Sequence, residues 1–192
     1  MKTPFDTPEA IRHQIWKELG RASLDRHHAW RTPVVASVGA DGAVNARTVV
    51  LRSVDAATGR LQIYTDARSA KVAELAFAPH AVLVFWSARL GWQLRVRVAV
   101  TVHTTGPEVA AVWERVRQSP SAGDYLAAKA PGTPLACDAV DVPAAPSAEA
   151  SERTPHLAVL NAQVQEIDWL ELNRDGHRRA RIAADDWTWL TP

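Results

Sequence analysis

The chain of 192 residues carries 22 basic and 21 acidic side chains, which leaves a formal net charge of +1. This balance provides no overall field that would draw the protein to nucleic acid or to a membrane surface, so any basic site must be local. A composition of 47% hydrophobic and 22% charged residues is that of an ordinary globular protein, long enough to form one domain with a sizeable core.

Cysteine usage and hydropathy indicate the compartment. The single cysteine, Cys137, has no second cysteine for an internal disulfide, and the stretch MKTPFDTPEA lacks the apolar segment of a signal peptide. No apolar run approaches the length of a membrane span. We therefore expect a cytoplasmic protein. The spacing of His, Cys, Asp and Glu shows no metal-binding pattern, so no metal site is expected.

The first predicted element is a helix over about residues 7–21. Thr7 suits the N-cap, Pro8 suits the first helical position, and Ile11, Ile15 and Leu19 recur at helical spacing. The period then changes to two in the stretches TPVVASVG, VNARTVVLRSVD and LQIYTD, which are separated by the turns ADG and ATGR. These stretches predict an antiparallel meander.

A short helix is predicted next in SAKVAELAFAP, with Ser69 as its N-cap. Two long strands joined at ARLG follow, and the second alternates cleanly from Trp92 to His103. GPEVAAVWERVRQ and SAGDYLAAKA suit helices, and residues 131–156, rich in Pro, Ala and Ser, predict a long loop. Three further strands are predicted in HLAVLNAQVQEIDWLEL, HRRARIAA and WTWL.

Strands in hairpin order with a few helices favour a mainly β protein with flanking helices (α+β), built as a closed or nearly closed antiparallel barrel in a single domain over residues 1–192. The interior of a small barrel is filled by side chains. A ligand is therefore expected on the outside or between two copies of the chain.

Basic residues gather around the predicted helix start at Ser69. Arg68 and Lys71 flank its first turn, where the helix dipole disfavours cations unless an anion lies there, and phosphate is the natural anion. Arg47 and Arg52 are candidates to converge on the same place. Five positions on a regular strand would put them on opposite faces, so a bulge or a strand end is required. The alternative is that these cations form ordinary surface ion pairs.

Three motifs, RTVVLR, YTDARSAK and WQLRV, resemble in order and spacing the flavin-binding strands of the pyridoxamine 5'-phosphate oxidase family. The resemblance covers roughly residues 30–130, with a weaker match at GHRRARI near the C-terminus. That family folds as a split β-barrel and binds FMN at a dimer interface. The resemblance therefore implies an FMN cofactor and a homodimer.

The resemblance also implies a cofactor site. The backbone of residues 49–51 would lie along the flavin ring, and residues 69–71 would bind the phosphate. The family usually has Arg where this chain has Ala70, and Arg68 is the candidate to replace it. The implied FMN-binding residues are Arg47, Val49, Val50, Leu51, Arg52, Tyr64, Thr65, Arg68, Ser69, Lys71, Gln93 and Arg181.

The implied substrate site departs from the family pattern. The family grips a substrate phosphate with Tyr, Arg and Ser, and this chain has Trp in place of Tyr. The family's Arg-x-His pair near the C-terminus is here reversed in order. The implied substrate-binding residues are Arg52, Trp113, Arg117, Ser121, His177 and Arg179. No side chain is expected to be the catalytic group, because the flavin carries the chemistry.

The expected function is an FMN-dependent oxidoreductase that takes a hydride from an amine or alcohol carbon of a small, possibly phosphorylated substrate and is reoxidised by oxygen. One alternative is an FMN-binding protein or flavin reductase with another substrate. Another is a nucleic-acid-binding barrel that uses WQLRVRV as a basic-aromatic strand, against which the balanced charge argues. The eight tryptophans suit a core and a subunit interface, and Trp169 or a neighbour is a candidate wall for a planar ligand.

Overall fold

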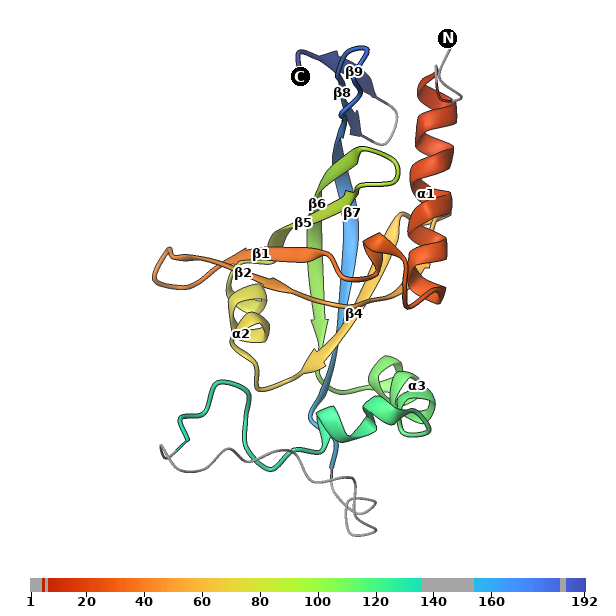
Figure 1. The fold of residues 1–192 in the computed structure, drawn as a ribbon. Coiled ribbons are helices and arrows are strands. Elements are labelled where there is room, and N and C mark those ends of the chain that lie inside the picture. The colour runs from red at the N-terminus through yellow and green to blue at the C-terminus, as the bar shows by residue number, and fades with distance from the viewer. Residues whose placement is uncertain (1–4, 6, 136–153, 184–185) are drawn as a thin grey trace.

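A computed structural model describes residues 5, 7–135, 154–183 and 186–192. Nine strands and three α-helices form this part of the chain (Figure 1). In chain order the elements are α1 Pro8–Leu24, η1 Ala29–Arg31, β1 Val34–Val38, β2 Val44–Thr48, β3 Leu51–Asp55, β4 Arg60–Asp66, α2 Ala70–Phe77, β5 His80–Ser87, β6 Trp92–His103, α3 Pro107–Val116, η2 Pro120–Tyr125, β7 Leu157–Glu171, β8 Arg178–Ala183 and β9 Trp187–Leu190, where η marks a 3-10 helix.

The strands form one antiparallel sheet with the order β2-β1-β5-β6-β7-β4-β3. The long strand β7 pairs with β4 through its first half and with β8 through its second half, and β9 extends the sheet beyond β8. The predicted mainly β fold with flanking helices is therefore confirmed. The sheet is not closed, because β2 and β3 stand at its two ends and do not pair with each other.

The stretch VNARTVVLRSVD was expected to form one strand, but it forms two. Strand β2 ends at Thr48, and β3 begins at Leu51. Between them the Val49 N–H still donates to the Pro33 carbonyl at 2.9 Å in the register of the β1–β2 ladder, but Pro33 has no N–H to donate in return, and the Val49 side chain is buried. Strand β2 therefore pairs with β1, and β3 pairs with β4. The break between β2 and β3 leaves the barrel open at this point.

Strand β6 shows the predicted alternation. Trp92, Leu94, Val96 and Val98 face the core, while Arg95 and Arg97 among the intervening residues are exposed. The second strand of this layer, β7, contributes the fully buried Trp169, whose ring stands edge-on to that of Trp92 at 5.3 Å. Trp169 therefore packs inside the core in this chain, which is the role expected for most of the tryptophans.

Two predicted segments differ from the structure or fall partly outside it. SAGDYLAAKA was expected to be a helix, but only its first half, SAGDY, is helical, as part of the short 3-10 helix η2, and residues 127–135 form turns and irregular structure. Of the predicted loop over 131–156, residues 131–135 and 154–156 have no helix or strand, and the remainder, including Cys137, lies outside the described residues. No helix in the described ranges is long and apolar enough to cross a membrane.

The three α-helices cover different parts of the sheet (Figure 1). Helix α1 starts as predicted, with the Thr7 hydroxyl accepting from Ala10 N at 3.2 Å, and packs its buried residues against β3 and the core. Helix α2 packs against β1 and β6, and α3 packs against β7. Helix α2 therefore brings the predicted phosphate-binding segment against the inner face of the sheet, beside the β1–β2 hairpin.

A buried carboxylate anchors α1 to the turn between β5 and β6. Glu18 is only 1% exposed, and its Oε2 accepts from Arg89 Nη2 at 2.9 Å and lies 2.7 Å from His28 Nε2. His28 Nδ1 accepts from Trp30 N at 3.1 Å, so Nε2 carries the proton and donates to Glu18. Burial alone would raise the pKa of Glu18, but the bonds from His28 and Arg89 outweigh it and the pKa is lowered.

We expect Glu18→Gln to lower the free energy of unfolding by about 2 kcal/mol at neutral pH, as the loss of charge-assisted hydrogen bonds should. Because the folded-state pKa lies below the ordinary carboxyl value, this contribution is fully present above that value and is lost as the pH falls through the folded pKa. Denaturant unfolding of both proteins at neutral and acidic pH measures it. Equal differences at the two pH values would contradict the assignment.

Candidate functional site

The predicted phosphate-binding residues meet at the start of α2, in a group we call the α2-start cluster. Lys71 Nζ donates to Thr65 Oγ1 at 2.9 Å, and Thr65 Oγ1 lies 3.4 Å from Ser69 Oγ. Both hydroxyl-bearing residues are buried. Ser69 is the N-cap residue, but its side chain makes no capping bond to the helix. Its hydroxyl and the first N–H groups of α2 therefore suit an anion. The cluster comprises Arg47, Thr65, Ser69, Lys71 and Glu74.

Arg47 reaches this cluster from the inner face of β2. Its Nη2 donates to both carboxylate oxygens of Glu74, at 2.8 and 3.0 Å, and its Nη1 donates to Ser37 Oγ at 2.5 Å. Glu74 also accepts from Ser37 Oγ and from Asn45 Nδ2. This buried carboxylate on α2 was not foreseen from the sequence. It fixes the Arg47 guanidinium in place, because several bonds of good geometry hold each partner.

The environment of Lys71 lowers the pKa of its ammonium group, through burial first and then through the nearby charge of Arg47. A bound phosphate would oppose both effects and raise this pKa again. We therefore expect affinity for a phosphate ligand to fall as the pH rises, beginning below the ordinary lysine value of 10.5. Titrations of FMN across this pH range test the expectation. Lys71→Arg should remove this pH dependence, and an unchanged profile in that variant would contradict it.

A second cationic group, the Tyr64 cluster, lies on the other face of β4 and comprises Arg52, Tyr64, Arg115 and Tyr125. The Arg52 guanidinium carbon lies 6.0 Å from the centre of the Tyr64 ring, and Arg115 Nη2 donates to the Tyr64 hydroxyl at 3.3 Å. Arg52 Nε is buried and has no hydrogen-bond partner among the described residues. Burial raises the pKa of both tyrosines, and the charge of Arg52 opposes the rise. Both phenols are therefore neutral hydrogen-bonding groups.

The bulge required by the spacing of the two arginines is present. Pairing of β3 with β4 shifts register between Leu51 and Ser53, so Arg52 occupies the irregular position. The two arginines nevertheless do not converge within the chain. Arg47 joins the α2-start cluster, and Arg52 joins the Tyr64 cluster. The cations of this region thus form two separate groups on the two faces of one strand.

Arg68 is engaged elsewhere in the structure. Its guanidinium binds Asp66, through Nε at 3.0 Å and Nη2 at 2.7 Å, and donates to the carbonyls of residues 127, 128 and 129. The idea that Arg68 replaces the missing arginine at Ala70 therefore has no support from this geometry. Its guanidinium ties the segment after η2 to the end of β4.

Gln93 and Arg181 lie apart from the two clusters, on the outer face of β6 and β8. Gln93 is opposite Leu170, and Leu170 is opposite Arg179, so these side chains share one face across three strands. Arg181 contacts Glu166 and Asp186 at 4.0 and 3.8 Å. Figure 1 shows β8 at the far end of the sheet from α2 and α3. One chain therefore does not bring the predicted cofactor residues together.

The predicted substrate residues are also dispersed. Arg179 binds Asp168 through Nε at 3.0 Å and Nη2 at 2.7 Å, while His177 accepts from Asn173 N in the turn before β8. Trp113 packs beside the small core of α3, and Ser121 Oγ lies 3.0 Å from Ser119 Oγ. Arg117 turns to Glu114 on the exposed side of α3.

Arg115, not Arg117, is the arginine of α3 that meets Tyr64. The buried residues Val109, Val112 and Val116 define the face of α3 that packs on the sheet, and Arg115 borders this face. The helical periodicity of this segment could have predicted that Arg115 borders the packed face. The resemblance to the family motif pointed instead to Arg117 as a substrate-binding residue.

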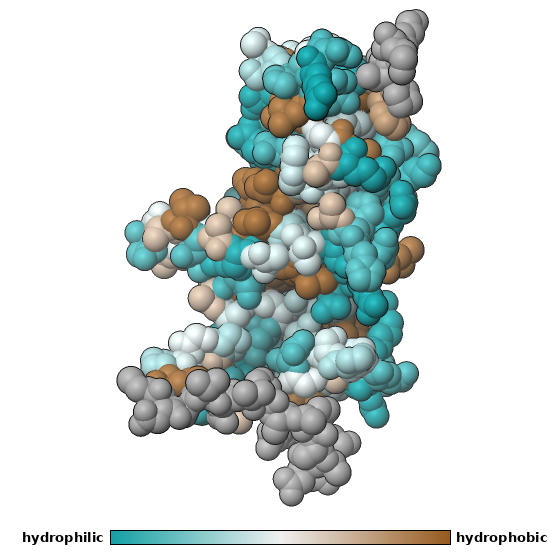
Figure 2. Space-filling model, viewed as in Figure 1, coloured by the Kyte–Doolittle hydropathy of each residue, from teal (hydrophilic) through white to brown (hydrophobic). Residues whose placement is uncertain are grey.

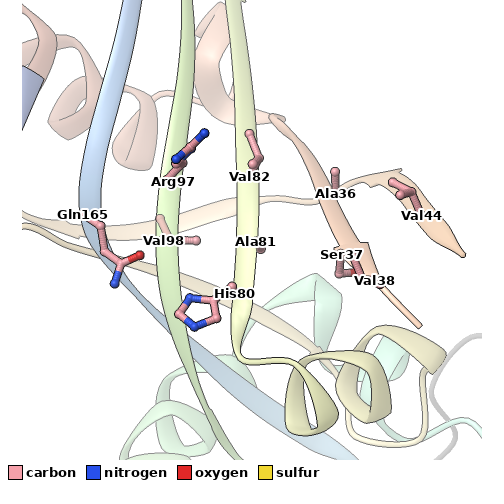
Figure 3. Close-up of a pocket in the computed structure, with 10 residues that line it drawn as sticks. All are labelled: Ala36, Ser37, Val38, Val44, His80, Ala81, Val82, Arg97, Val98 and Gln165. Carbon is pink, nitrogen blue, oxygen red and sulfur yellow. The ribbon is translucent and has the colours of Figure 1, made fainter. Parts of the chain in front are cut away.

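A cavity of about 470 Å³ opens beside the β1–β2 hairpin, on β1, β5, β6 and β7 (Figure 3). His80, Arg97 and Gln165 supply polar groups, and the remaining lining is mostly small and apolar. None of its lining residues belongs to the predicted cofactor or substrate set. Exposed apolar side chains surround this region, and Figure 2 shows apolar surface at the hairpin and over the middle of the sheet. The exposed apolar residues there are Val34, Val38, Val44 and Trp86.

The open antiparallel sheet and the polar and basic residues at the start of α2 are the features expected of a small cofactor-binding β-barrel. Residues 13–104 match the family model described as pyridoxamine 5'-phosphate oxidase, FMN-binding domain. This segment is therefore similar to the FMN-binding domain of the pyridoxamine 5'-phosphate oxidase family, and FMN is the cofactor that the similarity indicates.

Two curated relatives support this assignment. A pyridoxine/pyridoxamine 5'-phosphate oxidase from Thermosynechococcus vestitus is 45% identical over 62 residues, which are 32% of this chain and 28% of that protein. Pyridoxine/pyridoxamine 5'-phosphate oxidase 2 from Arabidopsis thaliana is 31% identical over 90 residues, 45% of this chain and 46% of that protein. The matched part thus spans less than half of either relative.

Solved structures share the fold. A pyridoxamine 5'-phosphate oxidase-related, FMN-binding protein from Nostoc punctiforme superposes with a TM-score of 0.72 at 23% identity and covers 100% of both chains. PhzG from Burkholderia lata, solved with tetrahydrophenazine-1-carboxylic acid, gives a TM-score of 0.74 at 19% identity over 100% of this chain and 98% of that one. At these identities the likeness concerns the fold.

Proposed function

We propose that the protein is an FMN-dependent oxidoreductase that acts, as a homodimer, on a small amine or alcohol substrate with an anionic group. The observation that carries the proposal is the pair of cationic groups on the two faces of β4. Tyr64 and Thr65 are adjacent, and each belongs to one group. The α2-start cluster suits the FMN phosphate, and the Tyr64 cluster suits a second anion.

The separation of the cofactor residues supports a site shared between two copies. Gln93 and Arg181 lie on the outer face of the sheet, away from the α2-start cluster. A second copy docked on this face would bring its own Gln93 and Arg181 to the flavin of the first. The exposed apolar residues of β1, β2 and β5 give such a dimer an apolar contact surface.

The redox chemistry of the reaction would come from FMN, which when bound would supply a two-electron acceptor for a hydride from the substrate carbon. The side chains of this protein bind and orient. Arg52 and Arg115 would hold the anionic group, and Arg179, fixed by Asp168, would face the substrate from the second copy. A cytoplasmic location remains our expectation.

The experiment that tests turnover is anaerobic mixing of the FMN-loaded protein with pyridoxamine 5'-phosphate. Loss of the flavin absorption bands, followed by their return when oxygen is admitted, is the expected result. Pyridoxamine without the phosphate is the matched control, and it should reduce the flavin more slowly because the Tyr64 cluster has no anion to hold. Flavin bands that stay unchanged with both compounds would contradict a vitamin B6 substrate.

A non-B6 substrate is the second candidate, and two observations favour it. Arg117, the arginine expected to grip the substrate phosphate, pairs with Glu114 on the exposed side of α3. The reversed order of His177 and Arg179 also departs from the family pattern. Reduction of the bound flavin by a nicotinamide cofactor, with none by pyridoxamine 5'-phosphate, would favour a flavin reductase.

Ala70 offers a gain-of-affinity test of the phosphate assignment. This residue begins α2 and is exposed, so a long side chain fits there without disturbing the core. We expect Ala70→Arg to raise the affinity for FMN about tenfold, or about 1.4 kcal/mol, because it adds one charged phosphate contact. Ala70→Gln is the uncharged control. The same FMN dissociation constant in all three proteins would contradict a phosphate site at this helix start.

A further inference from the structure

Arg31 joins the end of α1 to the start of β3. One nitrogen of its guanidinium, Nη1, donates to the Leu51 carbonyl at 2.6 Å. The same atom lies 2.5 Å from the Ser23 carbonyl and 3.3 Å from the Ala22 carbonyl, both in the last turn of α1. Three main-chain acceptors from two elements therefore meet on one side chain. A cation at this place also suits the negative end of the helix dipole.

Leu51 lies in the segment that the FMN assignment places along the flavin ring. Its carbonyl is held where the pairing of β3 with β4 is irregular, since the register shifts between Leu51 and Ser53. A strand at such a shift is less constrained by its ladder than a regular one. The bond from Arg31 supplies a constraint that the ladder does not.

We propose that Arg31 is a positioning residue of the cofactor site, which fixes the Leu51 main chain for the flavin ring. The inference rests on the proposed FMN site and on the expectation from the sequence that the ring lies along residues 49–51. Arg31 acts through the Leu51 carbonyl. A site whose supporting groups are fixed in advance binds without the entropic cost of ordering them.

The competing explanation is that Arg31 only stabilises α1. Glu18→Gln is the matched control, because Glu18 also anchors α1, through Arg89 and His28, and makes no hydrogen bond to β3. We would compare Arg31→Met, Arg31→Lys and Glu18→Gln for thermal stability, for the FMN dissociation constant, and for the visible circular dichroism of bound FMN, which reports ring orientation. All titrations are made at a temperature where every variant is folded.

We expect Arg31→Met to raise the FMN dissociation constant about tenfold and to change the dichroism of bound FMN, while Glu18→Gln lowers stability and leaves both flavin readouts at the level of the unmodified protein. Arg31→Lys, which keeps the charge, should show a smaller change in the same direction. If Arg31→Met fails to fold, Arg31→Lys still provides the test. The proposal would be overturned if the folded Arg31 variants left the FMN dissociation constant and the dichroism of bound FMN unchanged. It would also be overturned if Glu18→Gln shifted both by the same amount as the Arg31 variants.

Arg47→Ala distinguishes this failure from failure of the proposed site. If Arg47→Ala weakens FMN binding and the Arg31 variants do not, the inference about Arg31 alone is overturned. If neither Arg47→Ala nor the Arg31 variants change FMN binding, the inference falls together with the proposed cofactor site.

Discussion

Arg47→Ala is expected to weaken FMN binding at least tenfold and to lower the free energy of unfolding of the free protein by about 3 kcal/mol. The affinity falls because one charged contact near the phosphate is lost. The stability falls because Glu74, which is 8% exposed, loses the guanidinium that bonds to both of its oxygens. A buried carboxylate left without its cation is strongly unfavourable. Chemical denaturation and FMN titration measure the two effects separately.

The double variant Arg47→Ala with Glu74→Gln separates these two causes. A neutral amide at position 74 no longer needs a cation, so much of the lost stability should return. The affinity for FMN should stay low, because the phosphate still lacks Arg47. Recovery of FMN affinity along with stability would show that Arg47 acts only through the folding of α2 and would remove it from the phosphate site.

Trp86→Glu is expected to dissociate the homodimer and with it to abolish tight FMN binding. Trp86 is 46% exposed on the outer face of β5 and lies directly opposite Gln93 of β6. A carboxylate at the centre of an apolar interface would be buried without a partner on association. The oligomeric state by sedimentation and the FMN dissociation constant are the two readouts.

Leu24→Glu is the matched control for this prediction. Leu24 is 88% exposed at the end of α1, away from the sheet face to which the dimer is assigned. The same change of a large apolar side chain to a carboxylate should there leave both the oligomeric state and FMN binding unchanged. A Trp86→Glu protein that remains dimeric, or that binds FMN as tightly as before, would contradict the assigned interface.

The parts of the fold that the sequence predicted are those where local signals and packing agree. The Thr7 cap with Pro8 predicted the start of α1, and strict alternation predicted β6, because its inner residues must enter the core. The break at Val49 was not predicted, since Val is a strong strand former and the residue that ends the pairing is Pro33 on the neighbouring chain segment, which accepts from Val49 N–H but has no N–H to return the bond. The position of this break therefore depends on the pairing between strands and not on the local sequence of β2.

The candidate site was predictable in its components and less so in its arrangement. The helix start after Ser69 was predicted and is observed, with Lys71 beside it, while its binding of an anion stays a prediction. That Glu74 holds Arg47 was not predictable, because the contact joins two elements 27 positions apart and depends on how α2 packs on the sheet. Arg68 likewise turned to carbonyls of residues 127–129, about 60 positions away. Long-range contacts of this kind leave no local pattern.

An FMN site shared between two copies is tested by sedimentation of the protein with FMN, followed at flavin wavelengths. We expect flavin absorbance to sediment with the dimer, in equal numbers of FMN molecules and chains, and to be absent from monomeric Trp86→Glu. Flavin that sediments with a monomer at undiminished affinity would rule out the shared site.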